Sequence, residues 1–263
     1  MQRSLRSGVC YGLYKESDRM PKGRTVPAPK PSNPATPFQT QMQLHPAIPG
    51  FAQELADDIL ETGSTLPNVI AVADRAATLA TNLVEQFATA EHVACRAGCS
   101  WCCTFTSIRT SAPEVLRIAA YLRETLTPED LRTVTKRLAQ RAARISTLPE
   151  NRRGRARIPC ALLVNHRCSI YPVRPLACMG VTSSNAAACE ASYRSGWTRP
   201  IPNGARHLGI AVDVRTGMTE SLTQAGLDAS GLDLTIALLI ALEIPDAADR
   251  WLAGEPIFAD ATL

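Results

Sequence analysis

Closely spaced cysteines mark the middle of this 263-residue chain. Residues 95–103 read CRAGCSWCC, which places Cys95, Cys99, Cys102 and Cys103 within nine positions. On a helix or in a tight turn, this spacing brings the sulfur atoms to one side of the chain. Thiolates that converge repel one another unless a cation holds them, and zinc and iron both favour soft sulfur donors. The stretch therefore predicts a metal site.

A second group of cysteines lies within residues 158–203, which are rich in Cys, Pro, Ser and Asn. Its members are Cys160, Cys168, Cys178 and Cys189. A zinc site takes four ligands, and an iron–sulfur cluster commonly takes four thiolates, so this inventory exceeds a single site. The cofactor we expect is an iron–sulfur cluster of the [4Fe–4S] type or zinc. Spacing alone does not choose between them, because both prefer sulfur.

Disulfides would be the other use of so many thiols. The N-terminal sequence MQRSLRSGVCYGLYKESDRM is polar throughout and lacks the apolar run of a secretory signal. The longest apolar stretch, residues 234–244, contains Glu243 and is far shorter than the ~20 residues that span a bilayer. We therefore expect a cytoplasmic protein with no membrane contact. Thiols stay reduced in that compartment, which favours metal binding or catalysis over disulfides.

Apolar residues at helical spacing predict the elements that position these cysteines. One stripe leads from Pro67 almost into Cys95, and its members are Val69, Val72, Ala76, Leu79, Leu83 and Phe87. Ser111 and Glu114 form a capping box that opens a helix, and Thr127 opens the next, so that the two form a helical hairpin. Residues 158–203 read as loops.

The fold class that we predict is mainly α, a small helical domain with a cysteine-rich, loop-built metal site. Residues 1–45 form a disordered, Pro-rich basic tail, and residues 46–203 form the helical cysteine-cluster domain. Residues 204–263 form a C-terminal helical extension packed on the same domain, although residues 207–214 also fit a short strand.

Three segments together resemble a known family: CRAGCSWCC, the SAPE sequence that follows it, and IPCALLVNHRCSIYPVRPLAC. They are similar to the YkgJ-like cysteine cluster family, also called the CxxCxxCC putative zinc- or iron-chelating domain, over about residues 90–195. The resemblance implies a ligand set of Cys95, Cys99, Cys102, Cys103, Cys160, Cys168 and Cys178, and Cys189 fits a variant of the family that ends in Ala-Cys-Glu. It also implies accessory roles at Glu114, Tyr171, Arg174 and Pro175.

Two positions depart from the family pattern. Ala161 replaces the usual Pro, and Met179 stands where an Arg commonly follows the last cysteine of the pattern. Loss of that Arg removes a donor to sulfur or to an anionic substrate. Flagellin lysine N-methylases resemble the same cysteine domain, so the resemblance raises modification of a protein side chain as an activity.

The accessory residues also have plainer interpretations. Glu114 completes a helix cap without any metal, and Arg174 can donate to cluster sulfurs or equally to loop carbonyls. His92 and His166 flank the cysteine groups, where each is a surface residue or a replacement for a thiolate. Trp101 is expected to pack beside the site.

Three functions are consistent with these residues. The first is a metalloprotein whose cluster carries redox or substrate-activating chemistry on an unknown protein or small molecule; whether it is an enzyme stays open. The second is a structural zinc protein that serves as a protein or nucleic-acid interaction module. The third is a radical S-adenosylmethionine enzyme, whose signature Cys95, Cys99 and Cys102 match, but that function requires a parallel α/β barrel. A net charge of +4 and one short Arg run at residues 152–157 do not favour nucleic acid.

Overall fold

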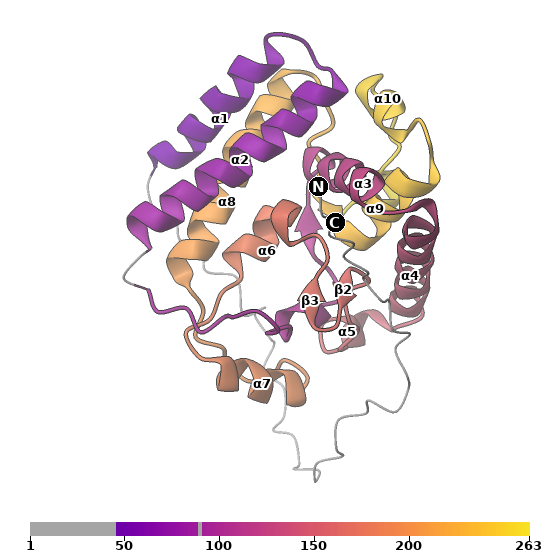
Figure 1. Ribbon diagram of the computed structural model, residues 1–263. Coiled ribbons are helices and arrows are strands. Elements are labelled where there is room, and N and C mark those ends of the chain that lie inside the picture. Colours follow the sequence, from indigo (N-terminus) through magenta and orange to yellow (C-terminus); the bar gives the residue numbers. More distant parts are fainter. Residues whose placement is uncertain (1–45, 89–90) are drawn as a thin grey trace, which may run out of the picture. The chain divides into compact units, whose positions relative to one another are not determined.

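The computed structural model describes residues 46–88 and 91–263, so the predicted disorder of residues 1–45 lies outside the described part. Helices dominate and sheet is scarce, which confirms the mainly α class (Figure 1). The α-helices of the described residues are α1 (Ala47–Leu60), α2 (Leu66–Phe87), α3 (Ala112–Thr125), α4 (Pro128–Ser146), α5 (Glu150–Arg153), α6 (Leu176–Gly180), α7 (Ala186–Arg194), α8 (Ala205–Gln224), α9 (Leu234–Glu243) and α10 (Ala247–Leu252).

Strands are short and occur in two antiparallel pairs within the described residues. β1 (Arg109–Thr110) pairs with β4 (Leu232–Asp233), and β2 (Leu163–Val164) forms a hairpin with β3 (Arg167–Cys168). Short 3₁₀ helices cover Cys102–Thr104, Tyr171–Val173 and Ala259–Ala261. The parallel barrel that a radical S-adenosylmethionine enzyme requires is not found in these residues, so that interpretation loses its structural basis.

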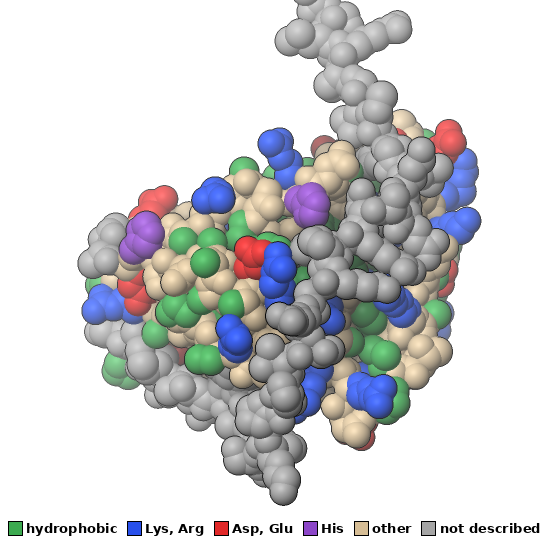
Figure 2. Space-filling model, turned by 90° about the horizontal axis from the view of Figure 1, so that it is seen from below, with side chains coloured by type: hydrophobic (Ala, Val, Ile, Leu, Met, Phe, Trp, Pro, Cys, Tyr) green, Lys and Arg blue, Asp and Glu red, His purple; other side chains and the backbone are tan. Residues whose placement is uncertain are grey.

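Helix length and the distribution of basic side chains indicate whether the described part of the chain could span a membrane or bind nucleic acid. Among the described helices, none combines the length and the apolar character needed to cross a bilayer. On the face shown in Figure 2, Lys and Arg side chains are scattered among apolar and other side chains rather than gathered in one patch. The predicted basic run lies at α5 and the turn after it, where Arg152, Arg153 and Arg155 are exposed.

Helices α1, α2 and α8 pack side by side (Figure 1). Val69, Val72 and Ala76 of α2 are buried as the stripe predicts, but Phe87 is 45% exposed because the buried face ends before the last turn. Gly217 of α8 lies against α1, where a Cβ atom would collide with the carbonyl of Pro49, so glycine permits the close approach of the two helices.

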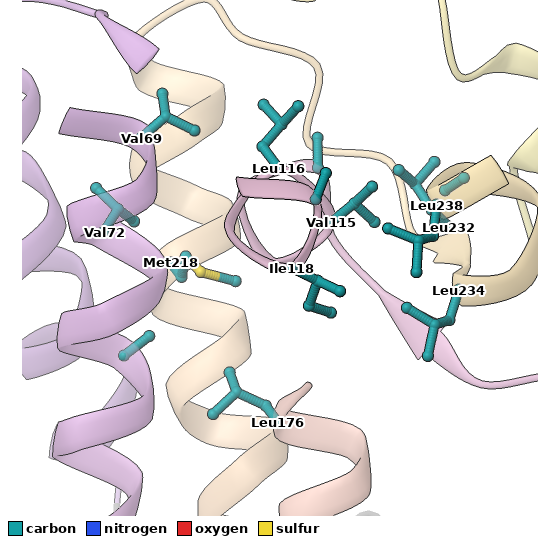
Figure 3. Close-up of a cluster of buried hydrophobic side chains, with 14 of the residues drawn as sticks. Val69, Val72, Val115, Leu116, Ile118, Leu176, Met218, Leu232, Leu234 and Leu238 are labelled. Atoms are coloured by element: carbon teal, nitrogen blue, oxygen red, sulfur yellow. The ribbon is translucent and has the colours of Figure 1, made fainter. Parts of the chain in front are cut away.

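Helix α3 forms the centre of the core. Figure 3 shows its buried side chains between Val69, Val72 and Met218 of α2 and α8 and the leucines of β4 and α9. The predicted caps are confirmed: Ser111 and Glu114 form the capping box of α3, and the Thr127 hydroxyl accepts from the Asp130 amide at the start of α4. The two helices pack mainly against α9 and only lightly against each other, which corrects the predicted hairpin.

Two further segments differ from the sequence-based expectation. Residues 158–203 hold α6, α7 and the β2–β3 hairpin in addition to loops. These elements have at most nine residues each, too short for a visible helical period. Residues 207–214 are part of α8 and not a strand, and Ile210, Ala211 and Val214 give them one buried face.

Candidate metal centre

A cavity of about 860 Å³ lies where the two cysteine stretches meet. Seven of the eight predicted ligands line it: Cys95, Cys99, Cys102, Cys103, Cys160, Cys168 and Cys178. Cys189, on α7, lies beyond the lining, where burial raises the pKa of its thiol and the Ser183 side chain offsets part of the rise. All eight are free thiols. The structure thus brings both stretches to one place and leaves Cys189 at the margin.

The first cysteine stretch is a series of turns and not a regular helix. Gly98 adopts a positive φ of +87°, and the Cys99 amide donates to the Arg96 carbonyl at 2.9 Å. Further on, the Cys103 carbonyl accepts from the Cys160 amide at 2.7 Å. This backbone bond joins the two stretches directly.

An aromatic cluster fastens the first stretch to α7. The ring centroid of Trp101 lies 5.1 Å from that of Tyr193, and the centroid of Trp197 lies 4.5 Å from that of Phe105 and 5.8 Å from that of Tyr193. Arg157 stacks over Tyr193 and donates to two carbonyls at the end of α7. Trp101 therefore packs beside the site, as predicted.

Glu114 holds the second stretch in place. Its side chain is 3% exposed, and its Oε2 accepts from the Ser111 amide, the Ser111 hydroxyl and the Thr110 hydroxyl at 2.8–3.2 Å. Its Oε1 accepts from the Leu176 amide at 2.7 Å, at the first turn of α6. Glu114 therefore caps α3, as predicted, and also the short helix that carries Cys178.

Arg141 of α4 is a positioning residue that the sequence did not lead us to expect. It is buried, and its guanidinium donates to the carbonyls of Pro159 at 3.1 Å and Phe105 at 2.5 Å and to the Thr235 hydroxyl. One side chain thus joins α9 to both cysteine stretches. The sequence did carry a sign that Arg141 is buried. It falls on the same helix face as Val134 and Leu138, where an apolar residue is expected.

Two basic side chains face the cavity near its sulfur atoms. Arg174 lines the cavity and stacks on the Tyr171 ring, with the guanidinium carbon 4.0 Å from the ring centroid. His166, in the turn of the β2–β3 hairpin, also lines it, and its Nδ1 lies 3.1 Å from the Ser100 hydroxyl. His92 is exposed and is not part of the lining.

Burial controls the protonation of the inner thiols. It raises the pKa of Cys160, Cys168 and Cys178 above the ordinary value of 9.0, and neighbouring cysteines raise that of Cys178 further. For Cys168, the charge of Arg174 offsets part of the rise. A hydrogen bond from the Cys103 thiol lowers the pKa of Cys102 to about 7, and the same bond raises the pKa of Cys103. Of this pair, Cys102 is therefore the thiol that ionises first.

The donor set suits a soft metal, but the sulfur atoms are not yet gathered into a coordination site. Within the described residues, no three Cys, His, Asp or Glu side chains lie close enough together to hold one ion. Free thiols from two stretches share the cavity, so the ligand types fit zinc or iron. Binding of one ion would have to draw them closer.

Comparison with protein families gives a match over the cysteine-rich part of the chain. Residues 94–195 match the family described as "CxxCxxCC: Putative zinc- or iron-chelating domain". This part of the chain is similar to that family. The resemblance read from the sequence is confirmed, and the matched residues hold all eight candidate ligands, from Cys95 to Cys189. Comparisons with curated proteins and with solved structures find no match.

Proposed function

We propose that the CxxCxxCC domain binds an iron–sulfur cluster or zinc through cysteines of both stretches, and that the centre serves a redox or protein-modifying reaction in the cytoplasm. The observation that carries this proposal is the cavity lined by seven cysteines that are free thiols. Free thiols suit the reducing conditions of that compartment. The family match supports zinc or iron as the class of metal.

The ligands that we propose fall into an inner and an outer set. The inner set consists of Cys102, Cys103, Cys160, Cys168 and Cys178. Charged members of this set raise the pKa of Cys103, Cys168 and Cys178, which indicates that the five thiols lie near one another. The outer set consists of Cys95, Cys99 and Cys189. The charge of Cys99 raises the pKa of the other two thiols, and the Ser183 carbonyl lies 4.0 Å from the Cys95 sulfur. When bound, an iron–sulfur cluster would supply electron transfer, whereas zinc would cross-link the two stretches.

A structural zinc site is the second candidate function. The observation that favours it is the shortness of the elements between residues 158 and 203, which have at most nine residues each. A metal ion would then stabilise the loops, and the surface would bind a protein or a nucleic acid.

Metal analysis of the anaerobically purified protein tests the proposal. We expect stoichiometric iron with sulfide, or zinc, in the wild-type chain. Cys102→Ser and Cys168→Ser should lose most of the metal, whereas Cys10→Ser, outside the matched domain, should keep it. Equal metal content in all three variants would overturn the ligand assignment. Brown colour with iron and sulfide supports the redox function, and a colourless zinc protein supports the structural one.

A further inference from the structure

Apart from its thiols, the ionisable side chains that line the cavity are basic or aromatic. Within the described residues, the lining contains Arg96, Arg167 and Arg174 but no aspartate or glutamate. Two histidines, His166 and His207, also line it. Arginine carries its positive charge throughout the physiological pH range, and a cleft lined by charges of one sign attracts ligands of the other. The lining therefore favours a negatively charged ligand.

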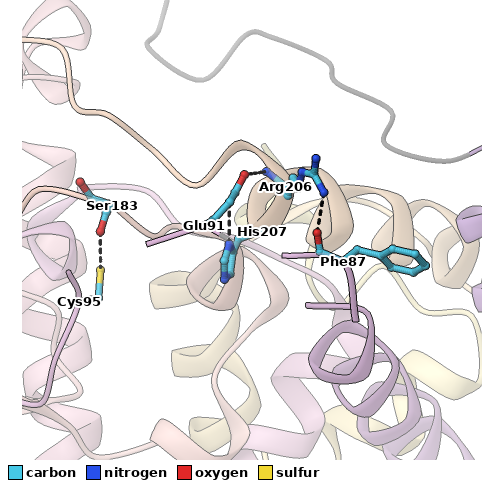
Figure 4. Close-up of polar contacts among 6 residues, drawn as sticks. All are labelled: Phe87, Glu91, Cys95, Ser183, Arg206 and His207. Carbon is cyan, nitrogen blue, oxygen red and sulfur yellow. Dashed lines mark hydrogen bonds and ion pairs between the residues drawn. The ribbon is translucent and has the colours of Figure 1, made fainter. Parts of the chain in front are cut away.

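Two carboxylates near the cavity wall are engaged by other donors. Oε2 of Glu91 lies 3.0 Å from Nδ1 of His207, and its Oε1 accepts from the Arg206 amide at 3.3 Å (Figure 4). Glu114 accepts from four donors through its two oxygens. Neither carboxylate is paired with an arginine of the lining in the described part of the chain. The positive charge of the lining thus lacks a countercharge from these two residues.

Arg174 is the arginine of the lining that is best placed to bind an anion. It is half-buried, whereas Arg96 and Arg167 are exposed. Its guanidinium carbon lies 4.0 Å from the centroid of the Tyr171 ring, so stacking orients the guanidinium plane. Among the described residues, no hydrogen bond or ion pair engages this guanidinium. Its N–H donors are therefore available to two oxygens of one ligand.

The same guanidinium lies close to the inner thiols. Its positive charge offsets part of the rise that burial causes in the pKa of Cys168. A metal-bound thiolate is therefore the other partner open to Arg174, but sulfur accepts hydrogen bonds more weakly than a carboxylate or phosphate oxygen does. An oxyanion paired with Arg174 would lie next to the proposed metal centre.

The cavity has room for an organic ligand. Its volume of about 860 Å³ falls within the range of roughly 300–1,000 Å³ that is typical of small-molecule sites. Half-buried apolar side chains form part of its wall, and they include Phe105, Ile108, Leu163 and Met179. The ligand that suits both the charge and the wall is an anion with an apolar body.

We propose that the cavity binds a small organic anion, whose oxyanion group pairs with Arg174 and whose apolar body lies against the cavity wall. The exposed Arg96 and Arg167 attract the anion to the cavity. A carboxylate and a phosphate share this chemistry, because each presents two oxygen acceptors to the two N–H donors at one edge of a guanidinium. The site consists of side chains that are present without metal, so the inference goes beyond the proposed function.

Four probes with the same aromatic ring test the inference: benzoate, phenyl phosphate, benzamide and benzylamine. Isothermal titration calorimetry of the full-length, anaerobically purified protein measures each affinity. We expect benzoate to bind about 10-fold more tightly than the neutral benzamide, as charge-assisted hydrogen bonds provide, and benzylamine not to bind. Phenyl phosphate should also bind more tightly than benzamide, and the tighter of the two anions identifies the oxyanion that the site prefers. Salt at about 0.5 M should weaken the binding of benzoate but not that of benzamide.

Variants at Arg174 test which side chain holds the anion. Arg174→Gln removes the charge and should lower the affinity for benzoate to that for benzamide. Arg174→Lys keeps the charge without the planar edge and should retain only part of the preference. Arg132→Gln, at an exposed position of α4 outside the lining, is the matched control and should keep the full preference. Metal content should stay at the wild-type level in all three variants, because arginine is not a metal ligand.

Three results would overturn the inference. They are failure of both anions to bind, equal affinities for benzoate and benzamide in the wild-type protein, and a wild-type preference for benzoate in Arg174→Gln. Should Arg174→Gln fail to fold or lose metal, Arg174→Lys gives the test, because it keeps the charge beside the thiols and removes only the two-donor edge; an undiminished preference in that variant would then overturn the inference. Absence of metal from wild-type protein that still prefers benzoate would overturn the proposed function alone.

Discussion

The two cysteine stretches reach the same cavity but are held there in different ways. Residues 95–103 consist of turns and a short 3₁₀ helix, and Cys95 at their start is exposed. Residues 160–178 contain a hairpin and α6, and charged side chains of α3 and α4 bond to their backbone. The second stretch is positioned before metal arrives, and the first is the one we expect to move.

The difference has a physical cause in the type of anchor. Glu114 and Arg137 are fixed on long helices, and hydrogen bonds to charged groups are roughly twice as strong as neutral ones. The first stretch relies on its own turns and on aromatic contacts with α7, a helix of nine residues, and Arg141 reaches only its far end, at the Phe105 carbonyl. A site built this way has a rigid half and an adaptable half.

Removal of a thiol from each half gives the largest expected contrast. Cys178→Ser should weaken metal binding about 100-fold, about 2.7 kcal/mol, because a positioned ligand is lost from the rigid half. Cys95→Ser should weaken it less than about 10-fold, because an exposed thiol must be ordered before it can bind. Competition with a chromogenic chelator measures both affinities. Equal losses would show that the two halves contribute alike.

Removal of the Glu114 charge should loosen the rigid half. Glu114→Gln leaves a carboxamide against four donors, and we expect the free energy of unfolding to fall by about 2 kcal/mol. Urea unfolding of the metal-free protein measures it. Glu129→Gln, at an exposed position in the first turn of α4, is the control and should change stability by less than about 0.5 kcal/mol. A loss as small as that of the control would mean that Glu114 does not hold α6.

A further effect should appear in the pH dependence of stability. The folded protein keeps Cys160, Cys168 and Cys178 protonated above pH 9, where the unfolded chain loses those protons. The free energy of unfolding of the metal-free protein should therefore fall above pH 9, by up to about 1.4 kcal/mol per pH unit for each thiol. Cys102, with its pKa lowered to about 7, contributes the opposite slope between pH 7 and 9.

Metal-loaded protein is the control for this titration. Its ligating thiols are already deprotonated, so its stability should not decline at the same pH. Chemical unfolding at a series of pH values from 7 to 10.5 compares the two forms. A flat profile for the metal-free protein would show that the inner thiols are not held protonated by burial.

Much of the local structure could be read from the residues themselves. The caps at Ser111 and Thr127 and the apolar stripe of α2 are interactions between positions three or four apart, and the structure confirms them. The cysteine spacing was enough to identify the family, because the pattern of Cys95 to Cys178 is itself the motif. The burial of Phe87 and the helical hairpin of α3 and α4 were predicted wrongly, since both depend on what lies next to the helix.

The sequence by itself determined the long helices α2, α3 and α4, the caps of α3 and α4, and the thiols that a metal would need. Only the tertiary structure decided which distant groups meet: Glu114 bonds to an amide 62 residues away, and Glu91 bonds to His207 across 116 residues. Local hydrogen bonds repeat at the period of the helix and leave a pattern in the chain. Contacts between distant segments are set by how helices pack around a shared core, and that packing has no period to read.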